Sequence, residues 1–359
     1  MIPNAIKAKD DNEVSLMVTG QTITLWEDLE LTRSFNSIAD KFTFSAPWDP
    51  TSTKARRLFK PFSYYEAAVY IGGKRVFTGT LMTHRPALGP NKKTITIEGY
   101  SKPGILADCP LSPKSWPFNP SGLTLQQIAD KVCQPYNITV KFEASPGSAF
   151  NNADKVDLNP DQKCYEFLSK LAIQRGLIMS SSEYGELVFL KTTSKPAIES
   201  ITGGVWPYLG SSVTYNGQKR FSEINALGTK MKGGYGEKHT VHDPELEGNG
   251  VYRPCTWKAQ DTAPGQLKTA ATSYWGRMIS SSIDINVEVD GWRLPREKSL
   301  WKDNIKINYK CPADMVYDTT EMLTREATLR RNNNSMETRL KLTFPEAYDG
   351  KTRGRFPWG

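Results

Sequence analysis

The most constraining feature of this sequence is a hydrophobic period of two that recurs through its first hundred residues. Residues 14–18 alternate apolar and polar side chains, a Thr-Gly turn follows, and Ile23 and Leu25 resume the alternation, which predicts a hairpin. Further short strands are expected at residues 42–47, 67–77 and 95–97, with Gly72-Gly73 as a tight-turn signal. Many short strands with few helical signals favour a compact antiparallel barrel or sandwich.

The pattern changes in the middle third of the chain. Five prolines break every regular period between residues 103 and 120, which marks a domain boundary or an extended connector. Helical spacing then begins, because Thr124 and Gln127 have the spacing of a capping box and the apolar residues of LTLQQIADKVC fall on one face. We expect this helix to end at Pro135 and a strand to follow over residues 138–142.

A second helix has signals at both ends. Asn159 is the expected N-cap and Pro160 the first helical residue, while Gly176 is expected to close a Schellman-type cap behind Arg175, whose charge suits the negative end of the helix dipole. Leu168 and Leu171 lie on its apolar face. Burying that face contributes roughly 5–9 kcal/mol, which does not cover about 1–2 kcal/mol of backbone ordering for each residue. The helix therefore needs a neighbour, and the hairpin predicted over residues 177–190 supplies one.

The last third returns to strands. Alternation is strict at residues 283–289 and 305–309, and a final hairpin runs over 322–344 with a turn at 332–334. One helix is expected over residues 266–278. Residues 232–250 look like a long exposed loop, and the basic, aromatic segment 345–359 is expected to be mobile unless a partner holds it.

Composition narrows the class of protein. A chain of 359 residues has room for two or three domains. The five cysteines are widely spaced without a CxxC pair and are interpreted as reduced, mostly buried thiols. The net charge of +8 is scattered rather than gathered in a basic stripe, so a solvated surface is favoured over a nucleic-acid platform. We expect no membrane anchor and no signal peptide.

Few residues suggest catalysis or metal binding. His239, His242 and Asp243 form the single candidate metal cluster, a weak one without the HExxH pattern, and a surface loop is the favoured interpretation. The glycine-rich GGYGEK lacks the P-loop pattern and reads as a loop. Trp292 and Trp301 could form a sugar-stacking platform, although two tryptophans around a turn more often form a structural clasp. We expect no catalytic residue, no metal and no cofactor.

The order of these elements resembles the Mu-like central baseplate hub proteins of contractile phage tails, which are related to the hub portion of type VI secretion spikes. The resemblance rests on three segments that span most of the chain. Its motif residues are Gly72, Gly73 and Gly79 in YIGGKRVFTG; Leu168, Leu171, Arg175, Gly176 and Gly185 in FLSKLAIQRGLIMSSSEYGELVFLK; and Trp292 and Trp301 in DGWRLPREKSLWKDNIKI. GVWPYLG, near Trp206, lacks the Asn-containing start expected for a second barrel.

The resemblance implies a mainly β protein with a small α+β part, in which two tube-like β-barrel domains flank a helix-hairpin domain. The expected divisions are residues 1–102, 103–198 and 199–345, with a basic tail at 346–359. It implies a homotrimeric ring that adapts a hexameric tail tube to a trimeric central spike, located in the virion baseplate after assembly in the host cytoplasm. Its implied partners are further copies of itself, a tail tube or tube-initiator protein, the central spike, baseplate wedge proteins and the tape measure protein.

Two other classes stay open on the sequence. A tail-associated cell-wall hydrolase or carbohydrate-binding protein would need a carboxylate pair in a cleft, which spacing alone does not identify. A nucleic-acid binder would show a steep dependence of DNA affinity on salt.

Overall fold

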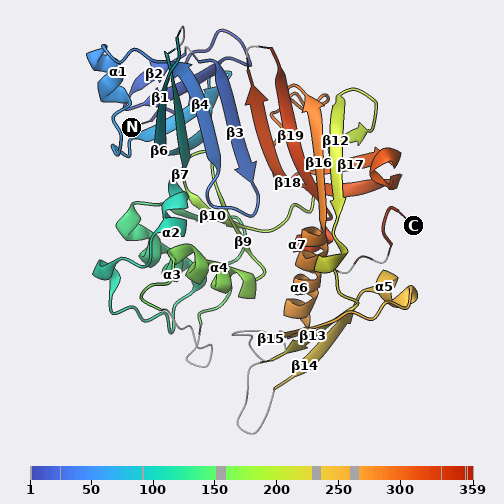
Figure 1. The fold of residues 1–359 in the computed structure, drawn as a ribbon. Coiled ribbons are helices and arrows are strands. Elements are labelled where there is room, and N and C mark those ends of the chain that lie inside the picture. The colour runs from blue at the N-terminus through green and yellow to red at the C-terminus, as the bar shows by residue number, and fades with distance from the viewer. Residues whose placement is uncertain are drawn as a thin grey trace.

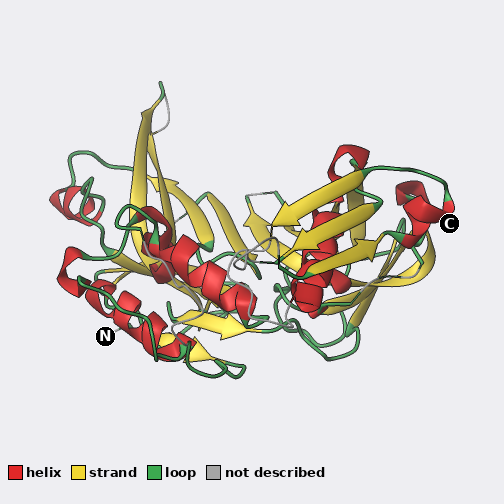
Figure 2. Cartoon of the chain, turned by 90° about the horizontal axis from the view of Figure 1, so that it is seen from below, coloured by secondary structure: helices red, strands yellow, loops and turns green. Residues whose placement is uncertain are grey.

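The computed structural model describes residues 2–24, 26–90, 93–150, 159–228, 236–258, 267–332, 334–351, 353 and 355–358. Strands dominate these residues, and thirteen of them form one large sheet that curves across the top of the molecule (Figure 1). Two three-stranded sheets and most of the helices lie below it, on one side of the large sheet (Figure 2). The mainly β class predicted from the sequence is confirmed.

The first half of the large sheet has the spatial order β3-β4-β7-β6-β5-β1-β2. Its elements are β1 (Val14–Val18), β2 (Gln21–Ile23), β3 (Asp28–Ser34), β4 (Lys41–Pro47), α1 (Thr53–Leu58), β5 (Glu66–Ile71), β6 (Lys74–Leu88) and β7 (Lys93–Ser101). The expected alternation is visible in β3, where Leu29 and Leu31 are buried and Glu30 is exposed. The predicted hairpin of the first two strands is confirmed as far as Ile23, since Leu25 lies outside the described residues.

The second half has the order β12-β16-β19-β18, with β17 on the other side of β18 and β11 beside β17. Its strands are β11 (Glu199–Thr202), β12 (Tyr208–Tyr215), β16 (Ile283–Asp290), β17 (Lys306–Cys311), β18 (Val316–Arg331) and β19 (Met336–Thr343). The last hairpin is longer than predicted, because β18 begins at Val316 and carries a bulge that lets it continue past the end of β17.

The two halves repeat one topology. Chain order β3, β4, β5, β6, β7 gives the spatial order β3-β4-β7-β6-β5, and chain order β12, β16, β17, β18, β19 gives β12-β16-β19-β18-β17, with every pair antiparallel. The bulges recur at equivalent places. The bulge after Val69 in the β5·β6 pair corresponds to the one after Tyr309 in the β17·β18 pair. The bulge between Leu81 and Thr83 in the β6·β7 pair corresponds to the one between Thr324 and Glu326 in the β18·β19 pair.

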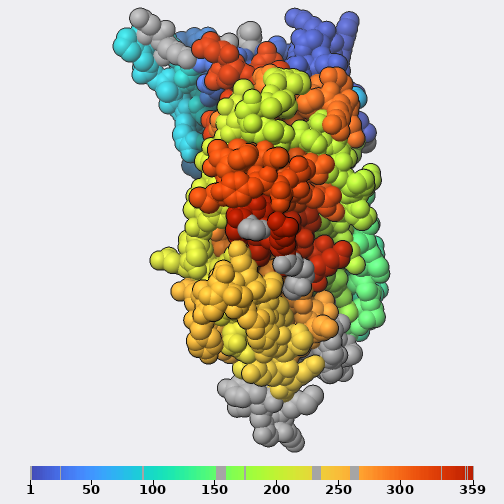
Figure 3. Space-filling view, turned by 90° about the vertical axis from the view of Figure 1, so that its right-hand side faces the viewer, coloured from blue at the N-terminus to red at the C-terminus, as the bar shows by residue number. Residues whose placement is uncertain are grey.

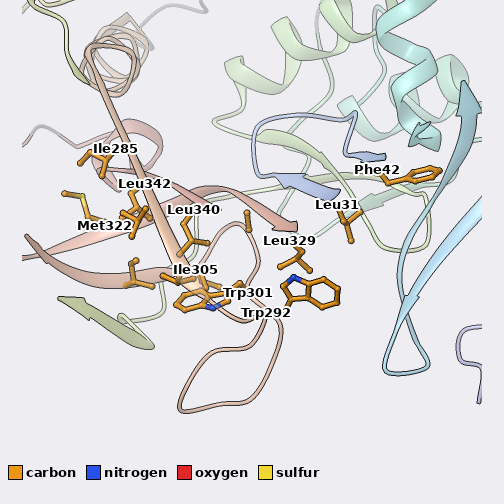
Figure 4. Close-up of a cluster of buried hydrophobic side chains, with 14 of the residues drawn as sticks. Leu31, Phe42, Ile285, Trp292, Trp301, Ile305, Met322, Leu329, Leu340 and Leu342 are labelled. Atoms are coloured by element: carbon orange, nitrogen blue, oxygen red, sulfur yellow. The ribbon is translucent and has the colours of Figure 1, made fainter. Parts of the chain in front are cut away.

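The halves join edge to edge through β3 and β18, which pair from Glu326↔Ser34 to Arg331↔Leu29. The core continues across this junction, where Leu31 and Leu329 are register partners and both are buried (Figure 4). None of the strand pairings among the described residues closes either half into a ring. The closure of each half into a barrel therefore stays a prediction.

The middle part contains a smaller core. Its elements are η1 (Lys102–Gly104), α2 (Ile105–Asp108), η2 (Pro113–Ser115), α3 (Leu125–Cys133), η3 (Gln134–Tyr136), β8 (Val140–Phe142), α4 (Cys164–Gln174), β9 (Ile178–Ser181) and β10 (Leu187–Leu190). The capping box of α3 is confirmed, since Gln127 N donates to Thr124 Oγ1 at 3.3 Å and Thr124 N donates to Gln127 Oε1 at 2.9 Å. The connector is more ordered than expected, because Pro103 starts a 3-10 turn that leads into α2.

Helix α4 ends as predicted and begins later than predicted. Gly176 has φ +63°, its N–H donates to Ile173 O, and Leu177 N donates to Ala172 O, which is the Schellman pattern. The predicted N-cap at Asn159 is wrong. Residues 159–162 form a turn instead, because Lys163 is held extended in a bridge to Pro110 and the helix starts only at Cys164.

A second lobe is inserted between β12 and β16. Its elements are η4 (Gly217–Lys219), β13 (Glu223–Leu227), β14 (Lys238–His242), α5 (Pro244–Gly248), β15 (Pro254–Lys258) and α6 (Leu267–Ser282). The expectation of a loop over residues 232–250 is wrong where the chain is described, since β14 pairs with β13 and Asp243 caps α5. Residues 232–235, which include the first half of GGYGEK, lie outside the described residues. Helix α6 continues past the predicted Met278 to Ser282, and Gln266 is not described.

The C-terminal segment is packed rather than mobile where it is described. A short 3-10 turn, η5 (Pro312–Asp314), precedes β18. Helix α7 (Glu346–Asp349) follows β19 and lies against α6. Phe356 is 4% exposed and stacks on Trp358 at 4.7 Å, and Trp358 Nε1 donates to Glu245 Oε1 at 2.7 Å. The apolar rings of the tail therefore complete the core of the chain itself. No described helix has the length and apolar character that a membrane span requires.

Candidate functional site

A buried charged cluster lies where the three parts of the chain meet. Arg33 of β3 approaches Asp40 at 3.7 Å and Asp303 at 3.9 Å, so one guanidinium bridges carboxylates from the two halves of the sheet. Ser34 N donates to Asp40 Oδ1 at 2.9 Å, and Ser181 Oγ of β9 donates to Asp40 Oδ2 at 2.9 Å. We call Arg33, Asp40, Asp303 and Ser181 the junction cluster.

Burial sets the electrostatics of the junction cluster. It raises the pKa of Asp40 to about 7 against the lowering effect of Arg33, and it also raises the pKa of Asp303. The guanidinium of Arg33 is thus shared by the carboxylates of Asp40 and Asp303, and burial disfavours the charged form of both. Through these contacts the cluster links β3, the loop before β17 and β9.

The hairpin β9–β10 packs against both halves of the sheet. Its outer face contributes Val188 and Leu190 to a small apolar cluster that includes Phe35 of the first half and Leu323 of the second. Phe35 also meets Tyr348 of α7 edge-on at 5.3 Å. The hairpin turn reaches β6, since Thr78 Oγ1 donates to Glu183 O at 2.8 Å. Through these contacts the hairpin links the middle part to both halves of the sheet.

The motif residues of the first and third segments have structural roles. Gly72 and Gly73 have φ +56° and +73° in the β5–β6 turn, and a Cβ on either would strike the N-terminal segment at the carbonyls of Asp11 and Ile6. A Cβ on Gly79 would strike the carbonyl of Tyr100 and the ring of Phe77. Trp292 and Trp301 are 0% and 1% exposed and share a backbone hydrogen bond of 2.8 Å, so they form a clasp and do not offer a sugar-stacking surface.

The helix-hairpin motif residues belong to the core and the surface of the middle part. Leu168 and Leu171 are buried in its apolar cluster. The guanidinium of Arg175 lies 4.4 Å from the centre of the Phe150 ring and donates to Ser148 O at 2.9 Å, so Arg175 holds a loop as well as standing at the helix end. Gly185 has φ +79° and makes the hairpin turn.

The candidate metal residues do not assemble. His239 and His242 are three residues apart on β14, so their side chains point to opposite faces of the strand. Asp243 is fully buried and makes a two-point contact with Arg220, both distances being 2.8 Å. Its carboxylate also caps α5. Among the described residues, no group of three His, Cys, Asp or Glu side chains is placed to hold a metal ion.

A cleft of about 180 Å³ separates the helix-hairpin part from the second lobe. Tyr165 and Ile173 of α4 line one wall, and Arg277 of α6 and Tyr348 of α7 line the other. No aspartate, glutamate or histidine is among its described lining residues, so it lacks the carboxylate pair that a lysozyme-like hydrolase requires. Burial lowers the pKa of Arg277 from its usual value.

Sequence reasoning missed the junction cluster. Arg33 and Asp40 are close in sequence, and Asp40 in FNSIADKF is a charged residue among apolar ones, which is a weak signal of a buried role. No sequence signal connects these residues to Asp303, because that contact exists only through the pairing of β3 with β18.

Comparisons with known proteins agree with this architecture. Residues 13–101 match the family model of the N-terminal domain of Mu phage baseplate assembly protein GpP-like, and residues 103–191 match that of the second domain of baseplate hub protein gp44-like. The chain is 28% identical over 353 residues to the baseplate hub protein gp44 of Escherichia phage Mu, covering 94% of this chain and 89% of that protein.

Solved structures show the same fold. The 43 kDa tail protein of prophage MuSo2 from Shewanella oneidensis superposes with a TM-score of 0.80 at 26% identity, covering 94% of this chain and 100% of that one. A tail protein from Neisseria meningitidis gives 0.78 at 20% identity, with 94% and 98% coverage. A type VI secretion component of E. coli, described as similar to phage T4 tail proteins gp27 and gp5, gives 0.56 at 10% identity, with 91% and 76% coverage. By sequence and by fold, this chain is similar to the Mu-like baseplate hub proteins of phage tails.

Proposed function

We propose that this baseplate hub protein forms a homotrimeric ring in which three chains contribute six similar β-domains. The observation that carries the proposal is the internal repeat, since each chain holds two units of one topology already joined edge to edge through β3·β18. Three such chains supply six units, and closed cyclic association is the ordinary way in which copies of one chain make a ring.

The ring would act as a symmetry adaptor between a hexameric tail tube and a trimeric central spike. The two units resemble each other in the sheet but carry different lobes below it, the helix-hairpin part on one unit and the β13–β15 lobe with α6 on the other (Figure 1). The sheet side can therefore present pseudo-sixfold symmetry, while the lobes repeat only three times around the ring. Tube or tube-initiator, spike, wedge and tape measure proteins are the proposed partners, and divisions near residues 102 and 198 the proposed domain limits.

We also propose a non-enzymatic role for the protein. The charged and motif residues hold the parts of the chain together, and the described cleft offers no carboxylate pair. A cell-wall hydrolase would clear peptidoglycan, so we expect the purified protein to leave a peptidoglycan suspension turbid.

The mass of the protein in solution tests the proposal directly. A trimer has three times the chain mass of 40.2 kDa, and light scattering after size exclusion or native mass spectrometry distinguishes it from a monomer. A monomer that also fails to bind the tube and spike proteins of its own phage would refute the ring.

A further inference from the structure

Among the described residues, one edge of β12 and one edge of the end of β6 have no partner strand. Their equivalents in the other unit, β3 and the end of β18, pair with each other. Within the chain, β3 of the first unit pairs with residues 326–331 of β18 in the second. The strand equivalent to β3 in the second unit is β12, which pairs only with β16 among the described residues. The segment equivalent to 326–331 in the first unit is residues 83–88 of β6, which pairs only with β7.

The equivalence holds residue by residue. Each segment begins just after the bulge of its long hairpin, at Thr83 in β6 and at Glu326 in β18. Before each bulge, a backbone N–H donates back to the preceding strand, from Leu81 to Tyr65 O and from Thr324 to Ile305 O. The residues before these acceptors, Tyr64 and Asn304, both have positive φ, at 49° and 53°. The two edges therefore have the same local geometry.

We propose that β12 of one copy pairs antiparallel with residues 83–88 of β6 in the next copy, in the register of the β3·β18 junction. This proposal rests on the trimeric ring and names the contact that would close it. Transferring the register places Ser212 opposite Ala87 of the next copy, as Glu30 lies opposite Arg330 within the chain. It places Val213 opposite Pro86 of the next copy, as Leu31 lies opposite Leu329.

Burial supports an occupant at these edges. At the covered junction Leu29 and Leu31 are 3% and 0% exposed, whereas Val213, the equivalent of Leu31, is only half-buried. Large apolar side chains flank both free edges: Trp206 is 66% and Leu209 is 54% exposed beside β12, and Leu88 is 79% exposed on β6. Such residues concentrated at open sheet edges indicate surfaces that a partner covers.

Two polar atoms at the β6 edge also lack partners. Ser63 Oγ and His84 Nε2 are inaccessible to solvent and make no hydrogen bond in the described structure. The equivalent of Ser63 in the second unit is Asp303, which faces Arg33 of β3 across the covered junction at 3.9 Å. Because Arg33 corresponds to Tyr215 in β12, the next copy would place Tyr215 near Ser63.

The two edges are accessible on the single chain. In Figure 3 the yellow-green surface that contains β12 faces the viewer near the top, and the cyan segment that contains the β6–β7 hairpin projects at the upper left. Pro86 has no N–H, so the proposed pairing has at most one hydrogen bond fewer than β3·β18 at this position. Proline is tolerated on an edge strand because its missing N–H faces outward, where no neighbouring strand needs it. The backbone N–H and C=O groups on either side of Pro86 remain available for pairing.

Cysteine cross-linking tests the register. The double variant Ser212→Cys/Ala87→Cys should form a covalent trimer on mild oxidation, because residues directly opposite in an antiparallel pair have Cα atoms about 4.5–5.5 Å apart, within disulfide reach. Each single variant is a control for the native thiols, of which Cys109 and Cys255 are half-buried. The matched control Ser212→Cys/Thr22→Cys places its second cysteine on β2, at the other end of the sheet. This variant should form no cross-link.

Charge at the same pair gives an independent readout. Ser212→Glu/Ala87→Arg copies the Glu30–Arg330 ion pair, which has a distance of 3.3 Å within the chain, and should preserve the trimer. Ser212→Arg/Ala87→Arg should weaken each contact by up to about fivefold, an effect that compounds around a closed ring. A trimer that cross-links through the cysteine at position 22 would overturn the pairing but keep the ring. A trimer whose stability is the same in both charge variants would do the same. A monomeric protein would overturn both.

Discussion

Replacing Arg33 by methionine should destabilise the protein in a pH-dependent way. The change removes the guanidinium that bridges Asp40 and Asp303 and leaves two carboxylates that burial disfavours without this partner. Breaking a buried ion pair by deleting one partner costs about 3–5 kcal/mol, and we expect a loss of this size in the free energy of unfolding at pH 7.5. Methionine keeps most of the buried length of the side chain, so packing should change little.

The sign of the pH dependence follows from the raised pKa of Asp40, about 7 in the folded protein against a usual 3.8. A carboxyl whose folded pKa is raised contributes stability that is complete below about pH 4 and is lost as the pH rises through about 7. Without Arg33 the folded pKa rises further, so the variant loses additional stability mainly above pH 6. At pH 5 both proteins hold Asp40 largely protonated, so the loss there should be smaller than at pH 7.5 by about 0.5–1 kcal/mol for this group.

Urea unfolding at pH 5 and at pH 7.5, at one protein concentration because assembly also stabilises the fold, measures the effect. Arg325→Met is the matched control: its guanidinium is similarly exposed, at 26% against 23%, but it pairs at 3.8 Å with the half-exposed Asp284, so we expect a loss below about 1 kcal/mol at both pH values. Adding Asp40→Asn to Arg33→Met should recover part of the loss at pH 7.5. An equal loss at both pH values, or no recovery in the double variant, would refute this account of the junction cluster.

Three further changes test other parts of the structure. Gly176→Ala should cost about 1 kcal/mol by thermal unfolding, since φ is +63° and nothing else lies within 4 Å of the added carbon, whereas Gly248→Ala in α5 should be neutral or slightly stabilising. Trp292→Ala should cost about 3–5 kcal/mol in urea unfolding, because the side chain is fully buried; normal stability with lost sugar binding would contradict the clasp. Asp243→Ala should cost at least about 2 kcal/mol, because it removes the two-point contact with Arg220, which keeps Glu245 at 2.7 Å as a partner, and the cap of α5. His242→Ala at the exposed end of β14 should change little, and near-stoichiometric zinc retained after desalting would contradict the absence of a metal site.

Local signals in the sequence predicted the local structure well. The two-residue period located β4, β7 and β16, because alternate side chains of a strand point to opposite faces and one face is buried. It also located β1 and β5, although the N-terminal segment buries their second face as well. Gly176 predicted the end of α4 because few other residues adopt a positive φ there at low cost. The start of α4 was wrong for a physical reason: a bridge from Lys163 to Pro110, distant in sequence, outweighed the favourable capping residues at 159–162.

The C-terminal segment shows the same limit. It is basic and aromatic, and we expected it to be mobile unless a partner held it. Phe356 and Trp358 nevertheless pack on Phe344, with ring centres 5.7 and 6.2 Å away, and Trp358 donates a hydrogen bond to Glu245 of the inserted lobe. Such a site depends on elements far away in sequence, and no local pattern reveals it.

The sequence by itself determined the mainly β class, the helix-hairpin part, the absence of a recognisable catalytic motif and the family resemblance, because each depends on periodicity, caps and turns encoded within a few residues. Only the tertiary structure decided that the two strand-rich halves share one topology and one sheet, that Arg33 meets Asp303, and that β12 and the end of β6 each have an unpaired edge among the described residues. These features arise from pairing between strands far apart in the chain. That pairing depends on which buried faces and edges fit together in three dimensions, so it cannot be read from any one segment.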